Sequence, residues 1–227
     1  MVKGFEYSKI VITVTTGLIL VGALLVFIFE YSNPLTIGEM SLFDKIQVSF
    51  FQSITTRTAG FASVSQENLT NASAAVSIIL MLIGGSPVGT AGGMKTVTIA
   101  VLICSAFATI RNKNSATLFG RRVSEESIKK AVAVVVIFLT ICATSTVLLM
   151  ATSNASAIDA VYETVSATAT VGLSRNLTAT LNTVGKLIII VTMYFGRVGP
   201  ISLAVALGSK NESQNVISEP TEDISIG

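Results

Sequence analysis

The chain contains one short polar motif twice, and the two copies stand 112 positions apart. The first copy reads Thr-Ala-Gly from residue 58, and the second reads Thr-Val-Gly from residue 170. Each copy lies between two long apolar segments, so it is too polar to face lipid and too apolar for an ordinary surface loop. Irregular backbone is tolerated at membrane depth only where protein buries it or where it lines a water-filled path. The duplication therefore predicts two pore loops in a membrane protein.

The composition agrees with a membrane protein and argues against several other classes. Hydrophobic residues make up 51% of the chain, charged residues only 12%, and the mean hydropathy is +0.73, which is more apolar than a soluble domain. The basic residues form no patch with interleaved aromatics, as nucleic-acid binding would require. Because the chain has no histidine and only two cysteines, we expect neither a zinc site nor a histidine base. No nucleophile stands beside a base, so an enzyme is not expected.

The first copy predicts an outer helix, a re-entrant helix, a loop and a broken inner helix. Residues 10–29 are uncharged and long enough to cross a hydrocarbon core of roughly 30 Å. After a turn at 30–40, apolar positions in 41–56 recur at helical spacing, but over only part of that depth. Residues 58–62 form the loop. The apolar stretch 72–110 would make a helix of about 58 Å, so we expect it to break at its glycine- and proline-rich centre, 84–93.

The second copy repeats this order after a basic connection. Residues 113–130 form the predicted cytoplasmic loop, since basic residues cluster on the cytoplasmic side of membranes. An outer helix at 131–158, a pore helix at 157–169, a loop at 170–174 and an inner helix at 181–208 follow. The predicted fold is thus an all-α membrane protein with two outer helix–pore loop–inner helix repeats, at 1–112 and 131–208, and a cytoplasmic tail at 209–227. Four full spans place both termini in the cytoplasm.

The two loops are the candidate ion-binding site. Glycine lets consecutive carbonyl groups turn towards a common axis without a side-chain clash, and rings of carbonyls replace the hydration shell of a potassium ion. The alternative is that these glycines only end helices, which leaves the duplication and the flanking threonines unexplained. We expect potassium to bind the backbone of Thr58, Ala59, Gly60 and Phe61 in the first loop, and of Thr170, Val171, Gly172 and Leu173 in the second.

Two arginines lie in or next to apolar segments, where a charged side chain is unusual. Arg197 sits near the middle of an otherwise uncharged run at 187–208, and a guanidinium at bilayer depth is costly unless it faces water or a partner. A positive charge below the loops would raise the barrier to cation permeation. A structural ion pair is the alternative, although no span contains an acidic residue. Arg57 directly precedes the first loop, and we expect it to donate hydrogen bonds to backbone carbonyls behind the filter as a structural support.

Three stretches give the chain a specific resemblance. They read Thr-Thr-Arg-Thr-Ala-Gly-Phe at 55–61, Gly-Gly-Ser-Pro-Val-Gly-Thr-Ala-Gly-Gly-Met-Lys-Thr at 84–96, and Tyr-Phe-Gly-Arg-Val-Gly-Pro at 194–200. The chain resembles the Ktr/Trk/HKT family of potassium transporters, most closely the carboxyl-terminal half of the bacterial KtrB subunits, because the family has four such repeats and this chain has two. The resemblance implies potassium uptake through a gate made by an intramembrane loop and a pore arginine. A flexible helix kink is the alternative role for the loop. The implied gate residues are Gly85, Gly89, Gly92, Gly93, Lys95 and Arg197.

Two pore loops cannot enclose a four-sided filter, so we expect a missing amino-terminal half or a second copy of the chain to complete the pore. The resemblance further implies a homodimer in a bacterial cytoplasmic membrane, seated on a cytosolic ring of KtrA-like nucleotide-binding regulatory subunits, with the basic loop as a docking face. No covalently bound cofactor is expected; potassium is the substrate, and sodium is a candidate activator. A cation-coupled symporter of the Trk type and a non-conducting half-protein stay open as alternatives.

Overall fold

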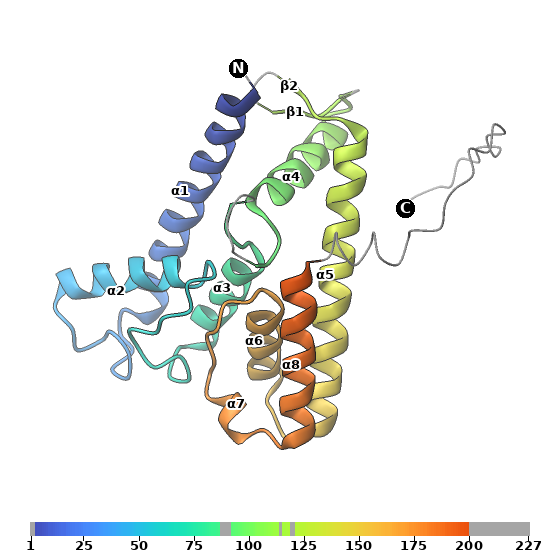
Figure 1. The fold of residues 1–227 in the computed structure, drawn as a ribbon. Coiled ribbons are helices and arrows are strands. Elements are labelled where there is room, and N and C mark those ends of the chain that lie inside the picture. Colours follow the sequence, from blue (N-terminus) through green and yellow to red (C-terminus); the bar gives the residue numbers. More distant parts are fainter. Residues whose placement is uncertain (1–2, 87–91, 114, 119–120, 200–227) are drawn as a thin grey trace.

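The structure, a computed structural model, describes residues 3–86, 92–113, 115–118 and 121–199. Within these residues the chain is mainly helical, as predicted (Figure 1). The described residues depart from an all-α fold in a hairpin of two short antiparallel strands, at the end of the molecule where α1 begins, and in an isolated parallel bridge between Ile83 and Met94. The elements are α1 (Lys3–Glu30), α2 (Leu42–Thr55), α3 (Asn71–Leu82), α4 (Thr96–Ile110), β1 (Thr117–Leu118), β2 (Arg121–Arg122), α5 (Glu125–Thr152), α6 (Ala157–Thr168), α7 (Leu177–Thr180) and α8 (Thr183–Val198).

Two helices of the described residues are long and apolar enough to cross a membrane. They are α1, over Ser8–Glu30, and α5, over Glu125–Thr152. Only 17% of the most apolar window of α1 and 28% of that of α5 is buried, so most of this apolar surface faces outwards, as in lipid. The remaining apolar helices α3, α4 and α8 have 12, 15 and 16 residues, and each is too short to cross a bilayer alone.

The predicted break in the first inner helix lies between α3 and α4. The two arms of the break, at 82–85 and 94–96, are joined by main-chain hydrogen bonds. The amide of Gly84 donates to the Met94 carbonyl over 2.9 Å, and the amide of Met94 donates to the Leu82 carbonyl over 3.1 Å. The Thr96 amide donates to Gly85 over 3.4 Å. The break is therefore a loop closed at its neck, and the predicted gate residue Gly89 lies outside the described residues.

The boundaries of the second copy differ from the prediction. The loop predicted at 113–130 ends earlier, because α5 begins at Glu125 and runs only to Thr152, not from 131 to 158. The Ser124 side chain accepts a hydrogen bond from the Ser127 amide and caps the helix, and two acidic residues occupy its first turn, where the helix dipole favours them. The prediction placed the start of this helix after its last charged residue. A helix can, however, continue past the membrane surface through charged residues, and α5 does so from Glu125. The short helix α7 was not predicted.

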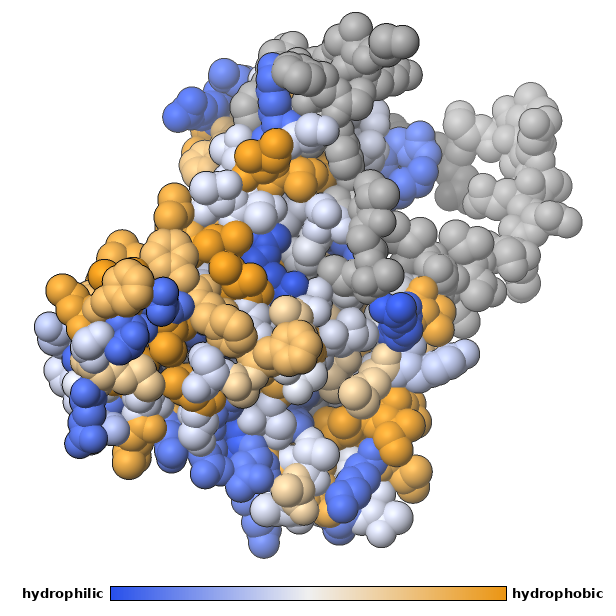
Figure 2. Space-filling view, turned by 60° about the vertical axis from the view of Figure 1, so that its left-hand side comes forward, coloured by the Kyte–Doolittle hydropathy of each residue, from blue (hydrophilic) through white to orange (hydrophobic). Residues whose placement is uncertain are grey.

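The two short helices that precede the loops are covered differently. Helix α6 packs against α3, α5 and α8, whereas α2 has an extensive contact only with α1 in the described chain (Figure 1). The buried side of α2 is polar, and its exposed side carries large apolar side chains that form an apolar surface (Figure 2). Those exposed residues are Leu42, Phe43, Ile46, Phe50, Phe51 and Ile54.

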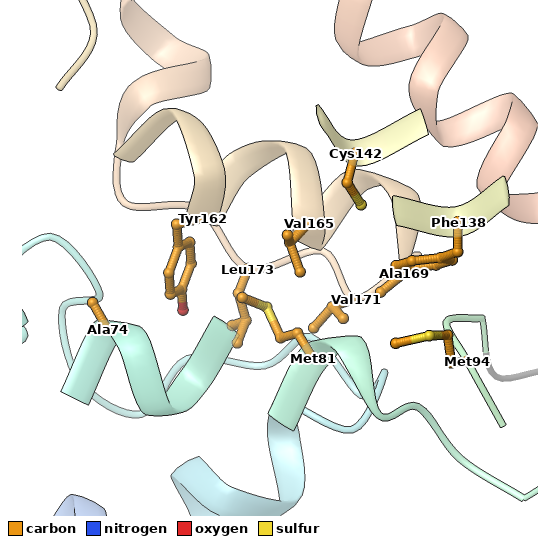
Figure 3. Packing of buried hydrophobic residues seen from close by; sticks show 10 residues of the cluster. All are labelled: Ala74, Met81, Met94, Phe138, Cys142, Tyr162, Val165, Ala169, Val171 and Leu173. Atoms are coloured by element: carbon orange, nitrogen blue, oxygen red, sulfur yellow. The ribbon is translucent and has the colours of Figure 1, made fainter. Parts of the chain in front are cut away.

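The main hydrophobic core surrounds the second loop. Side chains of α3, α5 and α6 meet there, and Val171 and Leu173 of the loop point into the cluster (Figure 3). Val171 is 5% exposed and Leu173 is 3% exposed, while Phe61 of the first loop is 71% exposed. The second loop thus has its side chains fixed by packing, and the first loop has them uncovered on the open side of α2.

Candidate functional site

The two glycine motifs lie against each other in space. A Cβ atom built on Gly60 would lie 2.1 Å from the carbonyl oxygen of Val171 and 3.6 Å from the Cα of Gly172. Residues separated by 112 positions in sequence therefore come within contact distance, through backbone and not through side chains. Only a glycine leaves room for this approach.

The backbone of both loops alternates in conformation in the same way. Thr58 and Gly60 have φ values of 70° and 79°, and Thr170 and Gly172 have 54° and 94°. The residue between each pair is not among the described residues with positive φ. A threonine with positive φ is unfavourable and persists only where its surroundings impose it. Alternation of left-handed and ordinary conformations lets successive peptide groups face the same way, which an extended strand does not.

Most carbonyl groups of the loops have no hydrogen-bond donor. Within the described residues, nothing donates to the carbonyls of the first three loop residues, 58–60, or of the second loop, 170–173. Only the Phe61 carbonyl is engaged, by the Thr55 hydroxyl over 2.6 Å. Carbonyls without a donor are uncommon away from water. Seven neighbouring ones provide the oxygen ligands that a cation needs.

Each loop is anchored from behind in its own way. In the first, the Thr55 hydroxyl also accepts the Phe61 amide over 2.8 Å, and the Thr55 carbonyl accepts the amides of Ala59 and Gly60. In the second loop, the position that corresponds to Thr55 is residue 167, an alanine, which offers no hydroxyl. There the Glu163 carboxylate accepts a hydrogen bond from the Ser174 hydroxyl over 2.9 Å. Glu163 is 5% exposed.

The glycine-rich segment packs directly on the start of the second loop. A Cβ on Gly92 would lie 2.2 Å from the Thr170 hydroxyl oxygen and 2.4 Å from the Ala169 carbonyl oxygen, and one on Gly84 would lie 2.1 Å from the Gly92 oxygen. Gly93 has a φ of 70° and also approaches Ala169. These glycines let the segment lie against the loop with no side chain between them.

Two cationic residues converge near this segment. Lys95 is the half-buried N-cap of α4, and its ammonium lies within electrostatic reach of the Arg197 guanidinium. Arg197 is in the last turn of α8. The preceding residue, Gly196, fixes that turn against the end of α6, since a Cβ there would lie 2.1 Å from the Thr168 carbonyl oxygen. The two residues predicted at the gate therefore share one region with Gly92.

Arg57 connects the first loop to elements around it. Its guanidinium donates to the Thr15 carbonyl on α1 over 3.3 Å and to the Gly84 carbonyl at the neck of the break over 3.2 Å. The acceptors are backbone carbonyls, but they belong to the outer helix and the break, not to the loop itself.

Several site residues were not predicted from the sequence. Arg175 is 8% exposed and donates from Nε to Asp159 over 2.7 Å, while its other nitrogens donate to backbone carbonyls of the first copy. Burial acts to raise the pKa of Asp159, but hydrogen bonds from Ser156 and Arg175 outweigh it, so this pKa lies below its ordinary value. A buried amide and phenol cluster, described below, was also missed. The described residues contain no group of three His, Cys, Asp or Glu residues that could hold a metal ion.

The chain is similar to known cation transporters over nearly its whole length. A family model described as TrkH, cation transport protein, matches residues 5–219. The chain is 38% identical over 229 aligned positions to "Ktr system potassium uptake protein B" of Vibrio alginolyticus, covering 99% of this chain and 50% of that protein. It is 39% identical to the protein of the same name from Bacillus subtilis (92% and 47% covered) and 33% identical to "Potassium/sodium uptake protein NtpJ" of Enterococcus hirae (97% and 50%).

A solved structure has the same fold. The crystal structure of the potassium transporter TrkH from Vibrio parahaemolyticus matches with a TM-score of 0.73 at 19% identity, over 89% of this chain and 44% of that one. The chain thus spans about half the length of the relatives that it matches.

Proposed function

The chain belongs to the TrkH family of cation transport proteins, and from that premise we propose that it forms half of the pore of a potassium uptake protein. Its relatives are transporters and not enzymes. The curated proteins that it resembles at 38% and 39% identity are named for potassium uptake. The proposal extends that activity to an assembly containing this chain.

One observation carries the proposal: two loops meet at Gly60 and Val171, and seven of their carbonyls receive no hydrogen bond from any described residue. A potassium ion that loses its hydration water needs several oxygen ligands at once, and rigid backbone carbonyls supply them without a charged side chain. The alternating φ signs support the same assignment, because they favour carbonyls that face one way. We assign the filter to Thr58, Ala59, Gly60 and Phe61 and to Thr170, Val171, Gly172 and Leu173.

The uneven cover of α2 and α6 supports an incomplete pore. The inner helix α3 of the first copy covers α6 of the second, but no helix in the described chain covers α2 in the same way. If each pore helix packs against the inner helix of the preceding repeat, the apolar face of α2 is the place for one further inner helix. Two such outer helix–pore loop–inner helix repeats, plus two from an amino-terminal half or a second copy of this chain, would close the ring.

The gate is assigned to the glycine-rich segment and the two cations beside it. Gly92 contacts the second loop directly, so the segment lies where it would obstruct ions leaving the filter. Lys95 and Arg197 add positive charge at the same place, which raises the electrostatic barrier for a cation. Movement of the segment away from the loop would lower both barriers.

The proposed setting is a bacterial cytoplasmic membrane, with both termini inside. We propose that the complete subunit forms a homodimer and is controlled by a cytosolic ring of nucleotide-binding subunits, which docks on the basic connection between α4 and α5. Sodium is proposed as an activator, not as a cotransported ion.

The test is rubidium uptake in a bacterium that lacks its own potassium uptake systems. The chain is expressed alone, and together with the amino-terminal half of the Bacillus subtilis Ktr protein B. The joint expression should give uptake that potassium competes away and sodium does not, and Gly60→Ser with Gly172→Ser should abolish it. Ser145→Ala, which removes a buried hydroxyl pair between α5 and α8, is the control and should leave uptake unchanged. Halves that assemble in the membrane without uptake would contradict the proposal. Uptake by the chain alone would identify a second copy as the completing partner.

A further inference from the structure

A buried cluster of three polar side chains joins the two copies behind their loops. The Gln52 amide on α2 donates to the Gln66 side-chain oxygen over 2.7 Å and accepts from the Gln66 amide over 3.1 Å. The Tyr162 hydroxyl on α6 donates to the same Gln66 oxygen over 2.9 Å. The Gln66 amide also donates to the Val64 carbonyl over 2.9 Å. We call Gln52, Gln66 and Tyr162 the inter-copy joint.

The joint is fully buried and its central amide is fully satisfied. Gln52, Gln66 and Tyr162 are 1%, 4% and 0% exposed. The Gln66 side chain has two donors and two acceptor positions, and all four are used. Removing the Tyr162 hydroxyl empties one of the two acceptor positions of the buried Gln66 oxygen, which is more costly than the loss of an exposed hydrogen bond. The joint therefore has one strongly preferred geometry.

Its position ties the end of the first loop to the support of the second. Gln52 lies one helical turn before Thr55, which holds Phe61, and Gln66 follows Phe61 in the chain. The Tyr162 ring lies beside Leu173 of the second loop in the core (Figure 3). Arg175 adds a second link on the same side, because it donates to carbonyls of residues 67 and 69.

The residues of the joint are not repeated in the other copy. At the spacing of 112 residues, Gln52 and Gln66 correspond to Thr164 and Thr178, and Tyr162 corresponds to Phe50. Thr164 bonds to Thr146, and Phe50 is exposed. The second copy thus contains no equivalent set, so the joint belongs to this one boundary between loops.

We propose that the inter-copy joint is a specificity-determining support, which fixes the separation of the two loops and so makes the filter accept potassium and reject the smaller sodium ion. This inference rests on the proposed function of the loops. Carbonyl oxygens discriminate against a smaller ion only if they resist closing around it. The loops touch at Gly60 and Val171 without any side chain between them, so their separation has to be set from behind. The joint connects the two copies there through buried side chains on both sides, whereas Arg175 reaches only backbone carbonyls of the first copy.

The test compares Tyr162→Phe with Thr146→Val. Tyr162→Phe removes one hydroxyl of the joint and keeps the ring. Thr146→Val removes a partly buried hydroxyl bond to α6 over 2.7 Å and lies in neither loop. In the jointly expressed halves described above, Tyr162→Phe should lower the ratio of rubidium to sodium uptake about fivefold, as expected for one buried hydrogen bond. Thr146→Val should leave the ratio unchanged, even if it lowers the amount of protein.

A second measurement needs no transport. In the purified chain in detergent, Tyr162→Phe should speed amide hydrogen exchange of residues 59–66 about fivefold, while Thr146→Val should not. Unchanged exchange, or changed exchange with an unchanged uptake ratio, overturns the inference and leaves the proposed function standing. A wild-type assembly without uptake overturns the proposed function and the selectivity role together, and the exchange result still decides whether the joint holds the loops.

Discussion

Replacing each loop glycine by alanine gives two substitutions with the same chemistry and different surroundings. Both glycines have positive φ, at 79° and 94°, so alanine is strained at either position by about 1–2 kcal/mol. At Gly60 the new methyl would also lie 2.1 Å from the Val171 carbonyl oxygen, whereas at Gly172 the nearest atom is the Gly60 Cα at 4.0 Å. The Val171 carbonyl would have to move by about 1 Å, and overpacking of this kind costs about 1–3 kcal/mol more.

We therefore expect Gly60→Ala to destabilise the isolated chain by about 2–5 kcal/mol, and Gly172→Ala by about 1–2 kcal/mol. Thermal or denaturant unfolding of the purified chain in detergent measures both values. Equal destabilisation by the two variants would refute the contact between the loops.

In the assembled pore, we expect the two alanine variants to have similar effects. If a further repeat follows the second loop in the ring, one of its loop carbonyls should lie as close to Gly172 as the Val171 carbonyl lies to Gly60. Gly172→Ala should then reduce rubidium uptake by the jointly expressed halves as severely as Gly60→Ala does, despite its mild effect on the isolated chain. Uptake close to that of the wild type would show that no loop lies beside Gly172.

Three further perturbations test the supports and the gate. Thr55→Val removes the hydroxyl that bonds both the amide and the carbonyl of Phe61 in the first loop, and it should lower stability by about 1–2 kcal/mol and reduce the rubidium-to-sodium uptake ratio. Gly92→Ala places a methyl 2.2 Å from the Thr170 hydroxyl oxygen, so the segment should leave the loop and rubidium leak in resting cells should increase; a decrease would argue against a gate there. Asp159→Asn leaves the buried Arg175 without its carboxylate and should cost about 1–2 kcal/mol at pH 7. Because the folded-state pKa of Asp159 is lowered, this difference should be constant above about pH 4 and shrink as the pH falls through the folded-state pKa.

Features that depend on neighbouring residues were predictable from the sequence. The break between α3 and α4 follows from glycines and a proline in an apolar run that is too long for one span. The two short helices before the loops follow from apolar spacing and from an N-cap serine three residues before an aspartate, at Ser41 and Ser156.

Features that depend on distant partners were not predictable. Gln66 reads as an ordinary loop glutamine, and its partner Tyr162 is 96 positions away. Glu163 is 5% exposed and hydrogen-bonded to Ser174 and Thr178, and the sequence around it gives no sign of these partners. The start of α5 was misplaced because its cap, Ser124, is followed by charged residues that were taken as the end of the membrane.

The different burial of the two loops could not be predicted from the repeated sequence motif either. The motifs correspond residue by residue, yet Val171 is buried and Ala59 is exposed. Side chains of α3 belong to the core around Val171. A duplication predicts equal surroundings, and the structure departs from that because α6 packs against three helices and α2 has an extensive contact with one.

The proposed filter requires backbone carbonyls of the two loops to bind a dehydrated potassium ion. Rubidium has an anomalous X-ray signal, so crystals of the assembled protein grown with rubidium measure this directly. We expect anomalous density beside the carbonyls of residues 58–60 and 170–172, which potassium displaces and sodium does not. Density that is absent there, or that lies instead against carboxylates elsewhere in the protein, would contradict it.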